Sequence, residues 1–419
     1  MTETLFMTGR CGFTGMRGSG TAARAAAAAL LMVLVMAGPA TAGITLFSPS
    51  SSSIASAGVL DMAEGKNGEI YFATDSGLSV FRDGWTTLRI TTPLVNGSLL
   101  SDHVLAVETD HRGYVWVGYP SGLQVLAGSE ITTLRDQQFL KNLNINTLYR
   151  NGEEMWVATG SAGVQRWRNG TWHRFVPGGE EGLEAYDVRS VAADRDSGAI
   201  YLASRDNGVW VAPAGPDPLR FTRLLPHVPE DPAGIQLRAD PFGGIYLFNR
   251  TTVLHHSLQE GIQRVRYTPD FITADTTVYD MVIARNGVSW YATGNGIYGC
   301  ADGKVTVHLT ALNGIGSNAV KRIFADRQGR IWFVTPDGVG YLPAILAEGT
   351  PIPVHIVETV GVVNTTPPLT TGPAEFLPPP TPLISVTIIP GPEESSRNPL
   401  SGFFSGLSRW LGSFFVQEQ

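Results

Sequence analysis

The sequence predicts an all-β protein: a seven-bladed β-propeller of four-stranded blades, with a Pro/Thr-rich linker and a short C-terminal amphipathic helix. One pattern of short apolar segments separated by turns recurs seven times, at intervals of 40 to 45 residues. Every copy has an aromatic residue in its second segment, with a glycine three or four residues before it. Four short strands in each repeat of about 40 to 50 residues are typical of a propeller blade.

The repeat is clearest at residues 315–342. This copy contains an apolar run at 320–325, a polar turn that ends in Gly329, a short strand centred on Trp332, and a Pro-Asp-Gly turn before another strand. The aromatic residues that correspond to Trp332 are Tyr71, Trp116, Trp156, Tyr201, Tyr246 and Trp290. We expect these rings to fill the space between neighbouring blades rather than to form a ligand cage.

The spacing of the repeats also fixes the blades and their strands. The blades are expected at residues 59–103, 104–144, 145–187, 188–234, 235–277, 278–319 and 320–342. Their inner strands are expected to begin at Val59, Val104, Ile145, Val188, Ile235, Val278 and Val320. An outer strand ends every repeat but the seventh, at residues 85–90, 131–135, 171–176, 220–225, 262–267 and 305–309.

The seventh blade needs a fourth strand from elsewhere in the chain, because an incomplete last sheet would leave two unprotected edges in the ring. Residues 44–47 (ITLF) resemble the other outer strands, and we expect them to close the ring, so that residues 43–342 form the propeller with 43–49 as its closing segment. The competing segment is 354–360 (VHIVETV), which is rich in β-branched residues but lies farther from Trp332.

Composition and charge suit this fold and exclude some partners. The chain has 419 residues with 48 glycines and 16% charged residues, which fits a turn-rich all-β structure with a large core. Its formal net charge is −7, and we find no cluster of lysines and arginines along the sequence. Both features argue against a nucleic-acid or anionic-membrane partner for the body of the protein.

Residues 1–42 are expected to be a signal peptide. Arg10, Arg17 and Arg24 precede an apolar run at 25–37, and residues 40–42 (ATA) give the small-x-small cleavage pattern. An uncleaved anchor is the alternative, but this run is short of the about 20 residues that span a bilayer. The mature protein is therefore expected to be extracellular or attached to the cell surface. Cleavage would leave Cys300 as its single cysteine, most simply a small buried residue without a disulfide partner.

The C-terminal region differs in composition from the repeats. Residues 343–398 are rich in proline and threonine and are expected to form an extended linker. Residues 399–416 are expected to form an amphipathic helix with a wide apolar stripe, made of Leu400, Phe403, Phe404, Leu407, Trp410, Leu411, Phe414 and Phe415. The stripe needs a cover, which the propeller itself, a partner protein or a membrane surface would provide.

The candidate binding site lies on one face of the ring, here called the loop face. It is built by the loops that enter the inner strands and by the turns between second and third strands. Its polar side chains suit a polar ligand such as a sugar or a peptide. The predicted ligand-binding residues are Asp102, His103, Tyr186, Asp187, Arg205, Asp206, Asn207, Arg250, Asn318 and Asp337, and the same loops contain Asp75, Asn249 and Asn295. The alternative for each is that Asp and Asn serve turn geometry.

The sequence predicts no catalytic residue, metal ligand or cofactor. It contains no Gly-x-Ser-x-Gly, no His-Glu-x-x-His and no phosphate loop. His255 and His256 are adjacent on an expected strand, so their side chains point to opposite faces and lack a third ligand. Asp326 begins a turn that recurs loosely at Asp110 and Asp194, but these turns offer too few acidic oxygens for calcium.

Two copies of the repeat resemble a known family. Residues 99–126 (LLSDHVLAVETDHRGYVWVGYPSGLQVL) and 315–342 (IGSNAVKRIFADRQGRIWFVTPDGVGYL) are similar to the two-component-regulator propeller repeat. That pattern is an Asn or Asp, an apolar strand, Asp-x-x-Gly, apolar-Trp-apolar-x-Thr, and x-Gly-apolar. The resemblance covers residues 59–342 and implies a seven-bladed propeller, often the extracytoplasmic sensor part of hybrid histidine kinases. No transmembrane helix and kinase follow here, so we expect a free-standing secreted propeller for which the resemblance implies ligand binding.

Three functional hypotheses follow. The first is an exported, non-catalytic ligand-binding or sensor-type propeller that binds a polar small molecule, a saccharide or a protein. The second is a metal-assisted propeller lyase or hydrolase, because some propellers that resemble this one are lyases with a histidine and a divalent metal on this face. His103 is the single histidine expected there. The third is a cell-surface interaction module that docks through the C-terminal helix.

Overall fold

The computed structural model describes residues 43–135, 140, 142–226, 234–258, 261–264, 276–301, 304–344 and 358–359. The expected signal peptide, nearly all of the linker and the expected C-terminal helix lie outside these residues. The described part contains one helical turn, η1 (Ala311–Asn313), and many short strands. None of its helices is long and apolar enough to cross a membrane.

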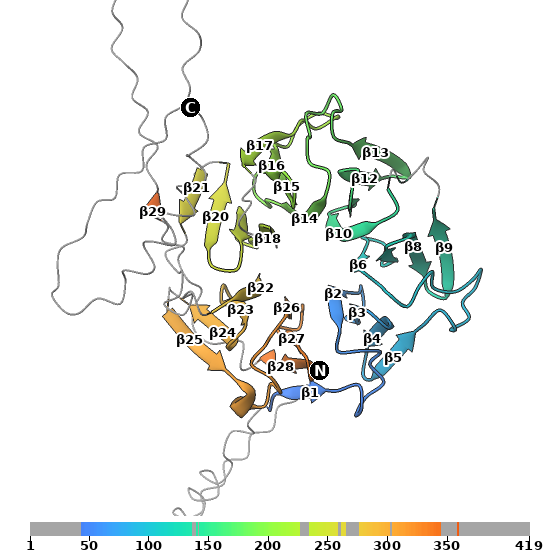
Figure 1. Cartoon of the computed structure of the whole chain (residues 1–419), viewed down its shortest axis with the longest axis vertical. Helices are drawn as coiled ribbons and strands as arrows, with labels where there is room; N and C mark the ends of the chain where they lie inside the picture. The colour runs from blue at the N-terminus through green and yellow to red at the C-terminus, as the bar shows by residue number, and fades with distance from the viewer. Residues whose placement is uncertain are drawn as a thin grey trace, which may run out of the picture. The chain divides into compact units, whose positions relative to one another are not determined.

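The described strands form seven antiparallel sheets that surround one axis (Figure 1). The first three sheets contain β2 (Val59–Glu64), β3 (Ile70–Thr74), β4 (Gly77–Phe81) and β5 (Trp85–Leu88); β6 (Ala106–Thr109), β7 (Val115–Tyr119), β8 (Gly122–Ala127) and β9 (Glu130–Leu134); and β10 (Ile145–Asn151), β11 (Glu154–Thr159), β12 (Val164–Arg168) and β13 (Thr171–Phe175). The next three contain β14 (Val188–Ala193), β15 (Ile200–Ser204), β16 (Gly208–Ala212) and β17 (Thr222–Leu225); β18 (Gln236–Ala239), β19 (Ile245–Phe248), β20 (Val253–Ser257) and β21 (Gly261–Arg264); and β22 (Val278–Ile283), β23 (Ser289–Thr293), β24 (Gly296–Ala301) and β25 (Lys304–Leu309). The seventh contains β26 (Arg322–Ala325), β27 (Ile331–Thr335) and β28 (Gly338–Leu342).

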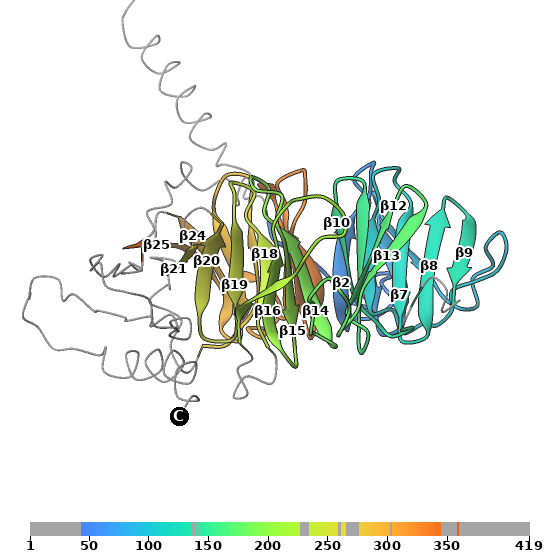
Figure 2. The ribbon, with the colours of Figure 1, turned by 90° about the horizontal axis from the view of Figure 1, so that it is seen from above.

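This arrangement confirms the predicted seven-bladed propeller. The first strand of each blade lies nearest the axis, and the chain visits the blades in sequence order (Figure 1). Seen from the side, the strands run from one face of the ring to the other (Figure 2). The loops that enter the inner strands and the turns between second and third strands therefore share one face, as the sequence predicts.

The ring is closed by the N-terminal strand. β1 (Thr45–Phe47) pairs antiparallel with β28, with Thr45 opposite Tyr341 and Phe47 opposite Val339. The pairing confirms the expectation for residues 44–47. In the competing segment, the described part is β29 (Glu358–Thr359), which pairs with β21 of the fifth sheet instead.

The second-strand aromatics are buried between blades, as predicted. Six of the seven are at most 2% exposed, and Tyr71 is half-buried. Trp156, for example, packs in one apolar cluster with Val188 and Leu202 of the next blade. Trp332 meets Phe72 of the first blade with ring centroids 5.4 Å apart. Cys300 is also buried, as expected, and burial raises the pKa of its thiol to about 12.

The recurring aspartate fixes the turn and the aromatic ring together. Asp326 accepts hydrogen bonds from the backbone N–H groups of Gln328 and Arg330, both at 2.9 Å, and from the indole N–H of Trp332 at 2.9 Å. Asp110 makes the same three kinds of contact, to Arg112, Tyr114 and Trp116. Burial opposes ionisation of Asp110, but the hydrogen bonds from the Arg112 guanidinium, Tyr114 and Trp116 outweigh it and hold the pKa of this carboxyl below its usual value. The aspartate therefore has a structural role in this repeat.

Removing the closing strand should destabilise the whole ring. A chain that starts at Ser56 exposes the edge of β28 and loses the contacts of Phe47 with Phe81 and Trp85, whose centroids lie 5.4 and 5.3 Å away. Burial of one such side chain contributes about 2 kcal/mol. We expect a markedly lower Tm than for a chain that starts at Gly43, measured by circular dichroism. Equal Tm values for the two chains would contradict closure by β1.

Substitution of the turn aspartate should be costly. Asp326→Ala leaves the buried indole N–H and two backbone N–H groups without their acceptor, and we expect a loss of about 3 kcal/mol or more in the free energy of unfolding. Asp337→Ala, in an exposed turn of the same blade, is the matched control and should change stability little. Urea denaturation measures both, and similar losses in the two variants would refute this role for Asp326.

Candidate ligand site in the central channel

The inner strands place one residue of each blade at an equivalent position beside the axis. This residue lies two positions before the one that pairs with the second-strand aromatic. The seven residues, here called the axial ring, are Asp61, Ala106, Thr147, Ser190, Gln236, Asp280 and Arg322. In β2, β10, β14 and β22 a register shift immediately precedes this position. Such a bulge re-aims the side chains beside it.

Several axial-ring side chains join one blade to the next. Asp61 accepts a hydrogen bond from the N–H of Val107 at 3.0 Å, and Asp280 accepts one from the N–H of Ile323 at 3.3 Å. The hydroxyl of Ser190 contacts both the N–H and the carbonyl of Leu237, at 3.1 and 3.3 Å. Gln236 donates to the carbonyl of Tyr279 at 3.3 Å. These contacts hold neighbouring inner strands at a fixed separation around the axis.

Five of the seven axial-ring residues border a polar cavity of about 260 Å³. Its walls come from blades one to five and seven, which identifies it as the central channel of the propeller. The lining residues are Leu60, Asp61, Leu105, Asn146, Thr147, Arg189, Ser190, Gln236, Arg238 and Arg322. Three of them are arginines and one, Asp61, is an acid.

The three arginines differ in their partners. Arg189 forms a two-point ion pair with Asp187, with both N–O distances 2.7 Å. Arg238 pairs with Asp280 at 2.5 Å. The guanidinium of Arg322 makes no hydrogen bond and no ion pair to any residue that the structure describes, although its charge acts on Asp61.

Two carboxyl groups of the inner strands have raised pKa values. Burial raises the pKa of Asp61 to about 6, against hydrogen bonds from Val107 and Met62 and attraction to Arg322 and Arg238. Burial likewise raises the pKa of Glu108 to about 7. The hydrogen bond from Thr109 lowers that pKa, and the charge of Asp61 raises it further. Both acids therefore exchange protons near neutral pH.

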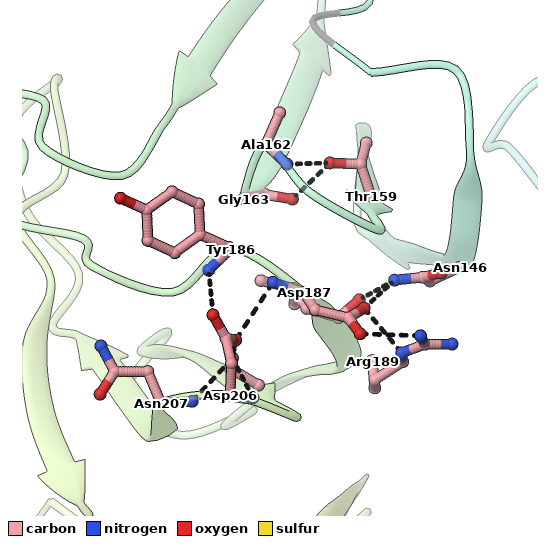
Figure 3. Close-up of polar contacts among 11 residues, drawn as sticks. Asn146, Thr159, Ala162, Gly163, Tyr186, Asp187, Arg189, Asp206 and Asn207 are labelled. Carbon is pink, nitrogen blue, oxygen red and sulfur yellow. Dashed lines mark hydrogen bonds and ion pairs between the residues drawn. The ribbon is translucent and has the colours of Figure 1, made fainter. Parts of the chain in front are cut away.

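Some of the predicted loop-face residues are connected to the channel (Figure 3). Asp206 accepts hydrogen bonds from the backbone N–H groups of Tyr186 and Asp187, at 3.3 and 3.2 Å. The Asp187 carboxylate in turn accepts a hydrogen bond from Asn146 at 2.8 Å and pairs with Arg189. Since Asn146 and Arg189 line the channel, this network orients groups at its mouth. The Tyr186 side chain stays 56% exposed beside it.

Most other predicted residues make contacts within or between the loops of this face. The Asp102 carboxylate accepts from the N–H of Ile90 at 2.7 Å, and the Asn318 side chain accepts from the N–H of Ala311 at 2.7 Å. Asn207 donates to the carbonyl of Glu184 at 2.9 Å. Two of the remaining predicted residues make backbone hydrogen bonds: the N–H of Arg205 donates to the carbonyl of Asp187, and the carbonyl of Arg250 accepts from the N–H of Val278. His103 and Asp337 are exposed. For Asp102 and Asn318 these bonds hold a single loop, whereas the Asn207 bond joins two loops.

The paired histidines point to different neighbours, as predicted. His255 contacts the Gly243 carbonyl at 3.0 Å and Asp240 at 3.1 Å, within its own blade. His256 contacts the Tyr201 hydroxyl of the preceding blade at 3.0 Å, and burial lowers its pKa to about 4. Within the described ranges, no group of three or more His, Cys, Asp and Glu side chains is placed to hold a metal ion.

Comparison with known proteins agrees with the fold. Residues 314–337 match the model of the family described as two component regulator propeller. No curated protein matches the chain in sequence.

Solved structures extend the likeness over most of the chain. The extracellular domains of two putative hybrid two-component systems from B. thetaiotaomicron match with TM-scores of 0.59 and 0.56, at 15% and 16% identity, over 72% and 71% of this chain. The matches cover 42% and 39% of those proteins, so the chain spans about two fifths of their length. Virginiamycin B lyase from Staphylococcus aureus matches with a TM-score of 0.53 at 11% identity, over 71% of this chain and 98% of the lyase. At these identities the likeness establishes the propeller fold alone.

Glu108 should make stability depend on pH in a defined direction. Its folded pKa of about 7 lies above the ordinary value of 4.5, so between these values the folded state keeps a proton that the unfolded state has released. Stability is then lost as the pH rises toward 7, by up to about 3 kcal/mol. Glu108→Gln removes this dependence, so its Tm should approach that of the natural protein near pH 5 and exceed it at pH 8.

The control for this experiment is Glu153→Gln, at an exposed glutamate in the hairpin of the next blade. Its Tm should follow that of the natural protein across the whole range. A Tm difference between Glu108→Gln and the natural protein that stays constant from pH 5 to pH 8 would show that Glu108 ionises normally.

Proposed function

We propose that this chain, a seven-bladed propeller that carries the two-component-regulator repeat at residues 314–337, is an exported domain that binds a small polar ligand in its central channel without catalysing a reaction. The observation that carries the proposal is the cavity on the axis, which is lined by charged and polar groups from six blades. Its size suits a ligand smaller than the drug-sized molecules that occupy pockets of roughly 300–1,000 Å³.

The channel groups suit binding because their positions are fixed before a ligand arrives. Asn146 and Arg189 are held by Asp187, and Ser190 and Gln236 are held by the next blade. Preorganised polar groups lower the side-chain entropy that the protein loses when a ligand binds. Arginine remains protonated at any physiological pH, so the three arginines are suited to bind oxygen atoms rather than to transfer protons. A saccharide unit offers such oxygens.

The loop face would extend this site for a larger ligand. Tyr186 is exposed beside the network that leads to the channel, and a tyrosine ring offers an apolar face and a hydroxyl. Arg205, Asp206 and Asn207 lie in the adjacent turn. A saccharide or peptide seated in the channel would therefore meet these side chains where it leaves the mouth.

Export is supported by two independent points. The sequence predicts a signal peptide at residues 1–42, and the two structural neighbours from B. thetaiotaomicron are extracellular domains of putative two-component systems. The likeness favours a sensor-type role, in which ligand binding is the primary event. The lyase alternative depends on His103, which is exposed in the loop before β6 and is not among the residues that line the cavity.

A bulky residue in the channel should abolish binding. Thr147→Trp places an indole at the axial ring, whereas Thr132→Trp places the same ring on the exposed face of outer strand β9. A thermal-shift panel of neutral monosaccharides, uronic acids, amino acids and dipeptides would identify binders, and calorimetry would give their Kd. We expect unchanged Kd for Thr132→Trp and at least tenfold weaker binding for Thr147→Trp. A binder that retains its affinity for Thr147→Trp would place the site outside the channel.

A further inference from the structure

Arg322 differs in chemistry from the other residues of the axial ring, and this difference indicates the class of ligand. The inference rests on the proposed function, because it assumes that the channel is the binding site. At the equivalent position of other blades, Asp61, Ser190 and Asp280 accept a hydrogen bond from the backbone of the following blade. Arg322 has only donors and cannot accept that bond.

The backbone N–H group of the first blade that an acceptor at position 322 would bind already has another acceptor. By the register of the ring, the equivalent backbone N–H is that of Met62, and it donates to the carboxylate of Asp61 at 2.9 Å. The junction of blades seven and one is secured elsewhere, where Arg327 pairs with Glu64 at 3.0 Å and contacts the carbonyl of Gly65. Arg322 thus does not perform the task that the ring position performs in blades one, four and six.

The charges around Arg322 favour an anion with a single charge. Arg189 is neutralised by Asp187, and Arg238 by Asp280. Asp61 is the acid whose charge acts on Arg322, and the two form no ion pair within 4 Å among the described residues. When Asp61 carries a proton, the lining has one net positive charge, and one negative charge on a ligand would balance it. A doubly charged group would leave an unbalanced negative charge in the channel.

The geometry of the guanidinium narrows the class further. It offers five N–H donors in a planar fork that matches the two oxygens of a carboxylate. The hydroxyls of Thr147 and Ser190 and the amide of Gln236 line the same cavity and would contact the hydroxyl groups of a sugar. We propose that the channel takes a small carboxylate-bearing ligand of the acidic-sugar class, and that Arg322 binds its carboxylate.

The test compares acidic with neutral sugars on the purified propeller. D-glucuronate and D-galacturonate are titrated by calorimetry at pH 5.5, alongside D-glucose, D-galactose and inorganic sulfate, which carries two negative charges at this pH. The uronates should bind at least tenfold more tightly than the neutral sugars and than sulfate. Arg322→Gln should weaken uronate binding by 10- to 100-fold, and Arg322→Lys should weaken it less, because it keeps the charge and loses the fork.

The matched control is Arg89→Gln, at an exposed arginine on the loop that follows β5, which should bind uronate as the natural protein does. Equal affinity for neutral and acidic sugars, absence of uronate binding, or an unchanged Kd in folded Arg322→Gln would overturn the carboxylate inference. The Thr147→Trp variant distinguishes failure of the acidic-ligand inference from failure of the proposal that the channel is the binding site. If neutral sugars bind and Thr147→Trp abolishes their binding, the channel site stands without its acidic ligand; if a uronate binds Thr147→Trp normally, both proposals fail.

Discussion

The contact between neighbouring inner strands is the constraint on which the rest of this propeller depends. Near the axis, Asp61, Ser190 and Asp280 each join their strand to the next through a polar contact with its backbone. Farther out, the buried aromatics fill the widening gap between blades. Two of these polar side chains, Asp61 and Ser190, also border the cavity. Some residues that join the inner strands therefore also line the proposed binding cavity. The spacing of the inner strands sets the width of the channel.

The junction between the last and first blades shows how this constraint can be relaxed at one place. There the closing strand β1 brings Phe47 against Phe81 and Trp85, while Trp332 packs on Phe72. At the same junction, on the face opposite the loop face, Arg327 pairs with Glu64. With the junction held by these contacts, the axial position of the seventh blade is free to hold an arginine. The departure from the repeat at the closing blade thus gives the channel an arginine, Arg322, that has no hydrogen bond or ion pair to a described residue.

The blade plan could be predicted from the sequence because it depends on residues that recur. The aromatic of the second strand and the glycines around it set the period, and the missing outer strand of the seventh blade pointed to residues 44–47. The loop face was also predictable, since strand direction alone places its loops. Asp102 and Asn318 show the limit of that reasoning. An aspartate or asparagine that holds a loop looks the same in a sequence as one that contacts a ligand.

The axial ring could not be predicted, because it depends on bulges. A register shift of one residue exchanges the faces of a strand, and no sequence pattern marks the shifts before Asp61, Thr147, Ser190 and Asp280. One signal was present: in six of the seven blades a polar residue stands nine to eleven positions before the second-strand aromatic. The most direct measurement is a crystal structure of the propeller with D-glucuronate. The account predicts the sugar on the axis with its carboxylate on Arg322, and a sugar bound only on the outer loops, with the channel filled by water, would contradict it.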